Sequence, residues 1–337
     1  MTPNILQAPL TSFGIEESTI SEIPGRAHQT WKIVSTKGIF ILKQYKNTDL
    51  EALQKTISVI QLLSKQKISI PPFLPNSAGT TITEADDRLY VLSSFIDHSL
   101  LLAPNVSSGI LQSAAKILGA LHKTNPIVYR DVLKPIDFSV TTKAVLDLVV
   151  QFKDRYPTLI NAHQEISDKL SLLMVIIDST QSLRETYCIP QFTSQWVCIH
   201  GDYTPENILV EQNTNKLFVI DWDNAKIAPR AFEIHKAIGA FCGLAPLNAY
   251  LVPVDWKKVE IFLRAYHAVN PFTKEVINEI VTSAAYGSST YWLRFTLLQT
   301  LAEDFRMLDL LPEKIEDCLF WKDNLDTYRR LLLSLLS

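Results

Sequence analysis

The feature that most constrains this chain is a pair of aspartates that each follow a short apolar run. Asp202 comes shortly after the run at residues 196–199, and Asp221 follows the run at 217–220. Asn207 stands at the start of another strand-like segment, so its amide oxygen can return to the same space. Carboxylate and amide oxygens are ligands that Mg²⁺ accepts while it keeps water and nucleotide phosphates in its shell. The pattern predicts a magnesium–nucleotide site at strand ends.

A lysine near the N-terminus supplies the cation that phosphoryl transfer requires. In enzymes that transfer a phosphoryl group, one carboxylate orients the attacking hydroxyl group, an Asp and an Asn hold the metal ion, and a Lys neutralises charge on the phosphates. Lys43 fits the last role, because it ends the apolar strand-like run at 39–42. We expect the turn at 24–28 to cover the phosphates through its backbone N–H groups.

The first hundred residues have the pattern of a small sheet with one helix packed on it. Four runs have strand character: residues 30–34, 39–45, 80–84 and 88–96. The first two flank a turn that contains Gly38, which predicts a β-hairpin. Residues 50–63 repeat apolar side chains at the helical period and follow a possible capping cluster at 47–49, so we predict an amphipathic helix that ends before Pro71.

From residue 107 onward the pattern is mainly helical. We predict helices over 107–122 and 141–185, the second interrupted at Pro157, and further helices after Pro229. An island of strand character lies between them, at residues 196–199, 208–211 and 217–220. A turn-like cluster separates the last two runs, so we expect them to form a second hairpin.

Length and pattern together predict two lobes. At roughly 150 residues per domain, 337 residues correspond to about two domains. We predict an α+β fold with a β-rich nucleotide-binding lobe at residues 1–96 and a larger, mostly helical lobe for catalysis and acceptor binding at 97–337. The loop after Ile96 is the expected hinge, with a cleft between the lobes.

The composition excludes several classes of protein. Hydrophobic residues make up 47% of the chain and charged residues 20%, which excludes a disordered chain. A net charge of −3 provides no basic face for nucleic acid. The longest apolar run, residues 172–177, is too short to cross a membrane, and the first ten residues lack the pattern of a secretory signal. We therefore expect a cytoplasmic protein with neither nucleic acid nor membrane as a partner, and free buried thiols for its four scattered cysteines.

The two-part motif resembles the signature of the aminoglycoside phosphotransferase/choline kinase superfamily, small-molecule relatives of the protein kinases that share a bilobal fold. The matching segments are H-G-D-x-x-x-x-N from His200 and I-D-W-x-x-A from Ile220. The resemblance implies that Asp202 is the catalytic base and that Asn207 and Asp221 are Mg²⁺ ligands. It also implies that Lys43 binds the α- and β-phosphates and that His200 braces the catalytic loop.

The same resemblance implies a site for ATP. The residues expected on the nucleotide, besides Lys43, are Gly25, Arg26 and His28 in the phosphate turn and Ser93, Ser94, Phe95 and Ile96, whose backbone groups would face adenine. Three departures from the family pattern stand out. Glu51 lies about a turn too early to pair with Lys43, Gly25 is the single glycine of its loop, and Glu233 replaces a usual aspartate. The role of Asp223 is open between binding a metal, binding the substrate and capping.

These residues support an ATP-dependent phosphotransferase that acts on a hydroxyl group of a small metabolite or antibiotic. The alternative is a non-catalytic scaffold on the same fold, like the spore-coat branch of the superfamily. A kinase that acts on proteins is disfavoured, because the segment at 221–229 is too short for a peptide-docking activation segment. The acceptor is open between homoserine, a sugar, an amino alcohol and an antibiotic, and GTP is an alternative to ATP.

Overall fold

The computed structural model describes residues 4–24, 28–45, 49–99, 101, 106–129, 132–133, 135, 138–187, 196–243 and 254–336. The chain divides into two compact units: Met1–Leu100 with Asn207–Asp223, and Leu101–Glu206 with Asn224–Ser337. The first unit is β-rich and the second is mostly helical, as predicted. The short segment Asn207–Asp223 groups with the N-terminal unit, whereas the sequence division at residue 96 places it in the second lobe.

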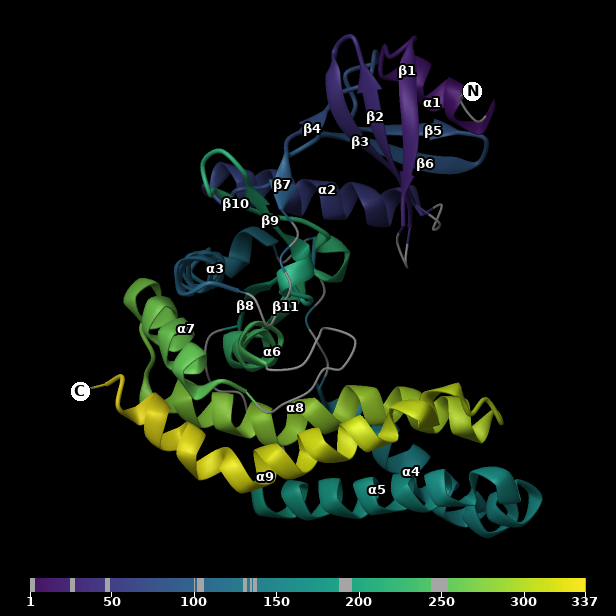
Figure 1. Ribbon diagram of the computed structural model, residues 1–337, viewed down its shortest axis with the longest axis vertical. Helices are drawn as coiled ribbons and strands as arrows, with labels where there is room; N and C mark the ends of the chain where they lie inside the picture. Colours follow the sequence, from purple (N-terminus) through teal and green to yellow (C-terminus); the bar gives the residue numbers. More distant parts are fainter. Residues whose placement is uncertain are drawn as a thin grey trace. The chain divides into compact units, whose positions relative to one another are not determined.

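An antiparallel sheet forms the centre of the first unit (Figure 1). Its strands are β1 (Ser18–Ile23), β2 (Gln29–Ser35), β3 (Gly38–Tyr45), β4 (Phe73–Leu74), β5 (Ile82–Ala85) and β6 (Arg88–Ser94). The order is β1-β2-β3-β6-β4, and β5 also pairs with β6. The predicted hairpin is confirmed, since β2 and β3 pair from Gln29↔Gln44 to Ser35↔Gly38. Strand β1 was not predicted, because most of its side chains are exposed and show no apolar alternation.

Helices cover both faces of this sheet. The predicted helix is confirmed as α2 (Leu50–Lys65), and the Asp49 carboxylate caps it by accepting the backbone N–H of Ala52 at 3.0 Å. Its apolar stripe, with Leu53 and Ile57, packs against Tyr45, Leu89 and Val91 of the sheet. Residues of α1 (Gln7–Ser12) and the turn before it pack with the opposite face of the sheet.

A second, three-stranded sheet completes the first unit. It contains β7 (His98–Ser99), β9 (Ile208–Glu211) and β10 (Leu217–Val219) in the order β10-β9-β7. The predicted hairpin between β9 and β10 is confirmed, with Val219 opposite Ile208 at its open end. This end carries two of the predicted site residues.

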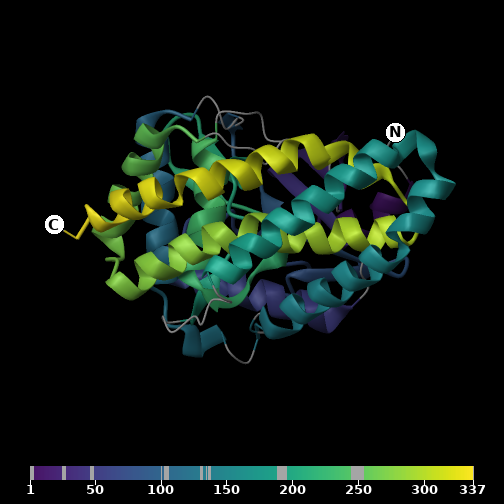
Figure 2. The ribbon, with the colours of Figure 1, turned by 90° about the horizontal axis from the view of Figure 1, so that it is seen from below.

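The second unit contains a two-stranded ribbon among helices. The strands are β8 (Trp196–Ile199) and β11 (Lys226–Pro229), which pair antiparallel. The helices are α3 (Ser108–His122), α4 (Phe138–Ala162), α5 (Ser167–Tyr187), α6 (Arg230–Cys242), α7 (Trp256–Val269), α8 (Lys274–Leu301) and α9 (Leu311–Leu333). The long helices α4, α5, α8 and α9 run beside one another (Figure 2) and share a core of Leu and Ile side chains. Among the described residues, no helix is long and apolar enough to span a bilayer.

Two sequence predictions for this unit were wrong or incomplete. Helix α4 continues through Pro157 to Ala162, and the break falls at residues 163–166 instead. Phe152 and Leu159 are buried on either side of the proline, so core packing offsets the lost backbone hydrogen bond. Strand β11 was not predicted, because Lys226 and Pro229 at its ends give a four-residue run without a strand pattern.

Candidate active site

The N-terminal unit brings Lys43 onto two carboxylates that lie far along the chain. The Lys43 Nζ lies 3.0 Å from Asp221 Oδ1 and 2.7 Å from Asp223 Oδ2. Lys43 is near the end of β3, and the carboxylates follow the end of β10, so two strand ends converge. The Lys43 side chain is only 23% exposed, which strengthens these ion pairs relative to surface pairs.

Charge on Lys43 is favoured by its surroundings. Burial alone would lower the pKa of Lys43, but neighbouring Tyr45 and the carboxylates of Asp223 and Asp221 outweigh burial and raise it. The ammonium group also lies 4.8 Å from the ring centroid of Tyr45, within range of a cation–π interaction. Lys43 is therefore a permanent cation at neutral pH, as a phosphate-binding lysine must be.

His28 joins this cluster from the segment before β2. Its Nε2 lies 3.1 Å from Asp223 Oδ2, and its ring lies 4.6 Å from that of Tyr45. Burial and the nearby Lys43 charge lower the pKa of His28, which favours a neutral ring that donates from Nε2. The buried Nδ1 then has a lone pair, and no described residue donates to it. Gly25 and Arg26, the other predicted residues of this turn, lie outside the described residues.

Asn207 and Asp221 share the open end of the β9–β10 hairpin. The backbone N–H of Ile220 donates to the carbonyl oxygen of Asn207 at 3.0 Å, one position beyond the last ladder pair. Asp221 follows with a φ of 62°, in the left-handed region where strained functional residues concentrate. The two predicted metal ligands are therefore held at one end of one hairpin.

The oxygen donors in this unit fit a magnesium ion. Asp221 has a carboxylate that is 39% exposed, and Asn207, which stands directly before β9, would add an amide oxygen. No cluster of three or more His, Cys, Asp or Glu with metal-site geometry occurs among the described residues. A small protein donor set is what Mg²⁺ uses when phosphates and water fill its other positions.

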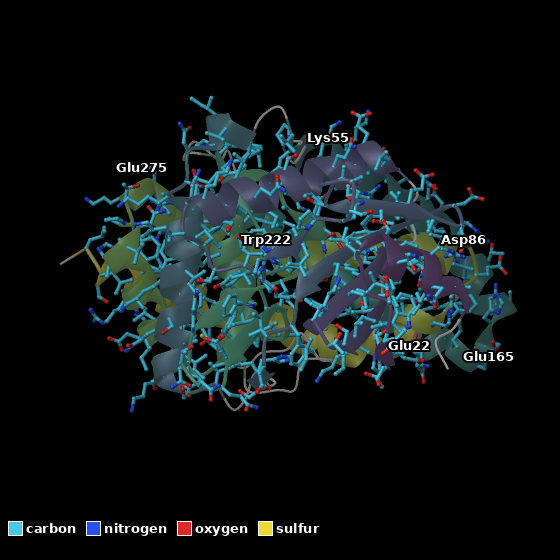
Figure 3. All side chains as sticks on the ribbon, turned by 90° about the horizontal axis from the view of Figure 1, so that it is seen from above. Glu22, Lys55, Asp86, Glu165, Trp222 and Glu275 are labelled. Carbon is cyan, nitrogen blue, oxygen red and sulfur yellow. The ribbon has the colours of Figure 1, made fainter. Side chains whose placement is uncertain are left out.

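Glu51 is engaged elsewhere on α2. It forms an ion pair with Lys55 one helical turn later, at 2.5 Å. Lys55 lies on the outer side of α2 (Figure 3), and the side chains of Lys55 and Glu51 are 44% and 76% exposed. In the part of the chain that the structure describes, the carboxylates on Lys43 are those of Asp221 and Asp223. The departure of Glu51 from the kinase pattern had left the partner of Lys43 unassigned. The residues that follow the β9–β10 hairpin supply that partner.

The predicted adenine segment, residues 93–96, lies at the end of β6, an inner strand of the sheet. Ser93 and Ser94 end β6, and the N–H groups of Ser94 and Phe95 donate to carbonyl groups of neighbouring segments. The carbonyl oxygen of Ile96 accepts from the ring of His98 at 2.7 Å. The role of this segment in binding adenine stays a prediction. It would depend on the backbone groups of residues 93–96 that take no part in these hydrogen bonds.

In the second unit, Asp202 follows β8 after a turn that requires glycine. Gly201 has a φ of +82°, and a Cβ there would lie 2.2 Å from the carbonyl oxygen of Asn224. The N–H of Asp202 donates to Nδ1 of the buried His200 at 3.2 Å. His200 therefore braces the loop through its ring, as the resemblance implied.

Glu233 supports the same loop from α6. Its buried carboxylate accepts the backbone N–H of His200 at 3.0 Å and that of Gly201 at 2.5 Å. A third bond comes from Nε2 of His122, at 2.8 Å, while Nδ1 of His122 bonds the hydroxyl of Tyr266. Burial alone would raise the pKa of Glu233, but these hydrogen bonds lower it, so the group is ionised.

Lysine 236 is a site residue that sequence reasoning missed. Its Nζ lies 3.0 Å from Asp202 Oδ1 and 2.8 Å from the carbonyl oxygen of Gly201. The available signal was spacing: Lys236 lies three positions after Glu233 on one helix, so both side chains share a face. A helix that carries Glu233 beside the loop also presents Lys236 to it.

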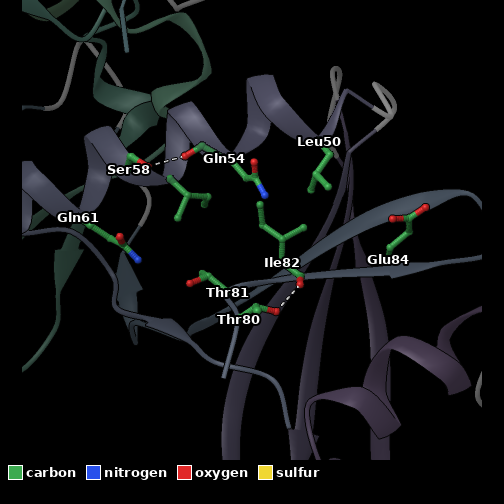
Figure 4. A pocket seen from close by; sticks show the side chains of 9 residues that line it. Leu50, Gln54, Ser58, Gln61, Thr80, Thr81, Ile82 and Glu84 are labelled. Carbon is green, nitrogen blue, oxygen red and sulfur yellow. Dashed lines mark hydrogen bonds between the residues drawn. The ribbon is translucent and has the colours of Figure 1, made fainter. Parts of the chain in front are cut away.

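A separate hollow of the first unit lies between α2 and β5 (Figure 4). Its volume is about 540 Å³, and neutral polar side chains such as Gln54, Gln61, Thr80 and Thr81 line much of it. None of the predicted site residues lines this hollow. It is not part of the candidate active site.

Comparison with known proteins identifies related chains. Residues 19–252 match the profile of the phosphotransferase enzyme family. A spectinomycin phosphotransferase, solved with ADP and spectinomycin, is 15% identical and has a TM-score of 0.64, over 98% of this chain and 97% of that chain. An aminoglycoside phosphotransferase from Alicyclobacillus acidocaldarius is 14% identical, with a TM-score of 0.64 over 99% and 98% of the two chains.

A third similar structure, a phosphotransferase solved with GDP and kanamycin, is 18% identical, covers 95% of this chain and 99% of that chain, and has a TM-score of 0.60. No curated protein matches the sequence. At these identities the structural likeness concerns the fold, and it confirms the predicted kinase-like α+β architecture.

Proposed function

Because the chain belongs to the phosphotransferase enzyme family, we propose that it transfers the γ-phosphoryl group of ATP to a hydroxyl group of a small molecule. The predicted resemblance to the aminoglycoside phosphotransferase/choline kinase superfamily is confirmed by this membership. Similar chains were solved with ADP and with GDP, so binding of a purine nucleotide is part of the proposal.

The observation that carries the proposal is the convergence of Lys43 and Asp221. A lysine that is charged at neutral pH and a carboxylate 3.0 Å away, from remote parts of the chain, match the pairing of a phosphate-binding cation with a metal ligand. In this proposal the ammonium group of Lys43 binds the nucleotide phosphates. Asp221 and Asn207 would hold Mg²⁺, which supplies positive charge to the transferring phosphoryl group.

Asp202 acts on the acceptor in this proposal. Its carboxylate accepts the hydroxyl proton as the hydroxyl oxygen forms a bond to the γ-phosphorus, and the bond from that phosphorus to the β-phosphate oxygen breaks. The products are a phosphate monoester and ADP. His200, Gly201 and Glu233 hold the loop, so that the carboxylate is oriented before the acceptor arrives.

The nucleotide would be bound by residues of the first unit. His28, together with Gly25 and Arg26, is the proposed phosphate turn, and residues 93–96 are proposed to present backbone groups to adenine. We keep Mg²⁺ as the proposed metal and the cytoplasm as the proposed location, with a small hydroxyl compound rather than nucleic acid or membrane as the partner.

Two variants test the proposal by separating chemistry from nucleotide binding. Asp202→Asn should abolish ADP release in an acceptor screen while thermal stabilisation by Mg–ATP persists. Lys43→Met should weaken that stabilisation, which for the wild type amounts to about 2.7 kcal/mol at 100 times the Kd. Turnover by Asp202→Asn would remove Asp202 from the mechanism. A wild-type protein that millimolar Mg–nucleotide does not stabilise would favour the non-catalytic scaffold.

A further inference from the structure

Helix α6 holds the loop of Asp202 with two side chains of opposite charge. The Glu233 carboxylate accepts the backbone N–H of Gly201, and the Lys236 ammonium group donates to the carbonyl oxygen of Gly201 at 2.8 Å. The two side chains are three positions apart on the helix, so they share one face. Both backbone polar groups of the residue before Asp202 are therefore bonded to α6.

Lys236 also contacts the carboxylate of the proposed base. Its Nζ lies 3.0 Å from Asp202 Oδ1, so one ammonium group joins the side chain of Asp202 to the carbonyl group of Gly201. An ammonium group has three N–H donors, which allows both bonds at once. The two charged side chains are 37% and 31% exposed, so solvent screens the pair less than it screens a fully exposed one.

The contact with Lys236 acts on the orientation of the carboxylate. Hydrogen bonds of the loop backbone fix the position of the Asp202 Cα, but they do not by themselves fix the side-chain torsions χ1 and χ2. The bond from Lys236 to Oδ1 restricts both torsions. Because the same ammonium group is held by the carbonyl oxygen of Gly201, it is a fixed point for the carboxylate rather than a mobile counter-ion.

We propose that Lys236 is a positioning residue, which holds the Asp202 carboxylate in the orientation that accepts the proton of the attacking hydroxyl group. This inference rests on the proposed function, because it assigns a residue to the same reaction. Loss of the contact slows the chemical step, since a misplacement of about 1 Å costs on the order of 100-fold in rate. Nucleotide binding is assigned to residues of the first unit, so it does not depend on Lys236.

Hydrolysis of Mg–ATP by the full chain tests this role with water as the acceptor. The water oxygen bonds to the γ-phosphorus, Asp202 takes a proton from the water, the bond to the β-phosphate oxygen breaks, and ADP and phosphate are released. Lys236→Met should lower kcat by about 10- to 100-fold and leave the KM for ATP within about twofold of the wild type. Lys236→Arg should keep most of the rate, because a guanidinium group also donates to two oxygen atoms.

Lys153 provides a matched control in the same unit. It forms an ion pair with Asp178 at 2.9 Å, and its side chain is 39% exposed, close to the exposure of Lys236. Lys153→Met should therefore leave kcat and KM unchanged. Thermal stabilisation by Mg–ATP and by Mg–ADP should be the same in Lys236→Met as in the wild type. An unchanged kcat in Lys236→Met would overturn the inference, and so would a loss of stabilisation by ATP alone, which would place Lys236 on the γ-phosphoryl group.

Amide hydrogen exchange without nucleotide separates this inference from the proposed function. The N–H groups of Gly201 and Asp202 are bonded within the loop, to Glu233 and to the ring of His200. They should exchange at least about tenfold faster in Lys236→Met, because the loop opens more easily, and at the wild-type rate in Lys153→Met. If the wild type hydrolysed no ATP, faster exchange would still support Lys236 as the residue that holds the loop, and only the phosphotransferase proposal would fail. Unchanged exchange at both amides would overturn the inference.

Discussion

Nε2 of His122 lies 2.8 Å from a carboxylate oxygen of Glu233, and both side chains are buried. The same carboxylate holds two backbone N–H groups of the loop that carries Asp202. The Glu233 carboxylate therefore has two effects. It stabilises the second unit, and it fixes the loop that carries the proposed base.

Glu233→Ala should therefore destabilise the protein by about 3–5 kcal/mol, because it leaves three buried donors without their acceptor, namely two backbone N–H groups and the His122 ring, at about 1–3 kcal/mol each. Urea unfolding measures the change. Glu260→Ala is the control: Glu260 forms an exposed ion pair with Arg264 on α7, and its loss should cost under about 1 kcal/mol. Equal stability of Glu233→Ala and the wild type would contradict the assigned role.

The turn at Gly201 provides a second prediction. Gly201→Ala should destabilise the protein and impair activity, since a Cβ at this left-handed position would lie 2.2 Å from the carbonyl oxygen of Asn224. Gly109→Ala in α3 is the matched control, because no atom lies within 4 Å of its added Cβ. There alanine should stabilise the helix by about 0.5–1 kcal/mol. Thermal unfolding of both variants checks the contrast, and similar effects at the two positions would refute it.

The parts of the fold that were predicted from sequence are those specified by local patterns. The β2–β3 hairpin and α2 have a clear period and clear ends, such as the cap at Asp49. Strand β1 has neither, since it lies at a sheet edge with most side chains in solvent. The predicted break of the helix at Pro157 was wrong. The free-energy cost of a proline inside α4 is outweighed by burial of side chains along the helix, which only the tertiary structure reveals.

The candidate site residues likewise fall into those that local patterns predict and those that only the tertiary structure brings together. Lys43 and Asp221 were predicted because each ends a strand-like run, and the structure brings them together. Lys236 was missed, because its approach to Asp202 depends on how α6 packs beside β8. The role of Asp223 was left open, and its contacts with Lys43 and His28 now place it in the same cluster as these two residues.

His235 gives a prediction about acid stability. Burial lowers the pKa of His235 to about 3, and its ring packs 4.7 Å from that of Trp321. Below its ordinary pKa of 6.5 the unfolded chain binds a proton that the folded chain excludes until about pH 3, so this group makes stability fall as pH falls between these values. His235→Phe should reduce that slope by up to about 1.4 kcal/mol per pH unit. Urea unfolding at several pH values between 6.5 and 4 measures it, and an unchanged slope would contradict the burial of a neutral ring.

The two carboxylates on Lys43 should respond differently to substitution. Asp221 is the proposed metal ligand with Asn207, whereas Asp223 also bonds His28, a residue of the proposed phosphate turn. Asp221→Asn should raise the Mg²⁺ concentration required for half-maximal ADP release by about 10-fold or more, as loss of a ligand does. Asp223→Asn should leave the Mg²⁺ requirement closer to that of the wild type and raise the KM for the nucleotide, because Lys43 and His28 lose a shared anchor.

Titration of activity with free Mg²⁺ at saturating nucleotide, followed by titration with nucleotide at saturating Mg²⁺, separates the two effects. Asp97→Asn, in the same unit but without a described contact to Lys43, is the control for a change of charge alone. If Asp221→Asn kept the wild-type Mg²⁺ dependence while Asp223→Asn shifted it, the metal ligand would be Asp223. The open end of the β9–β10 hairpin would then hold Asp221 mainly as a partner of Lys43.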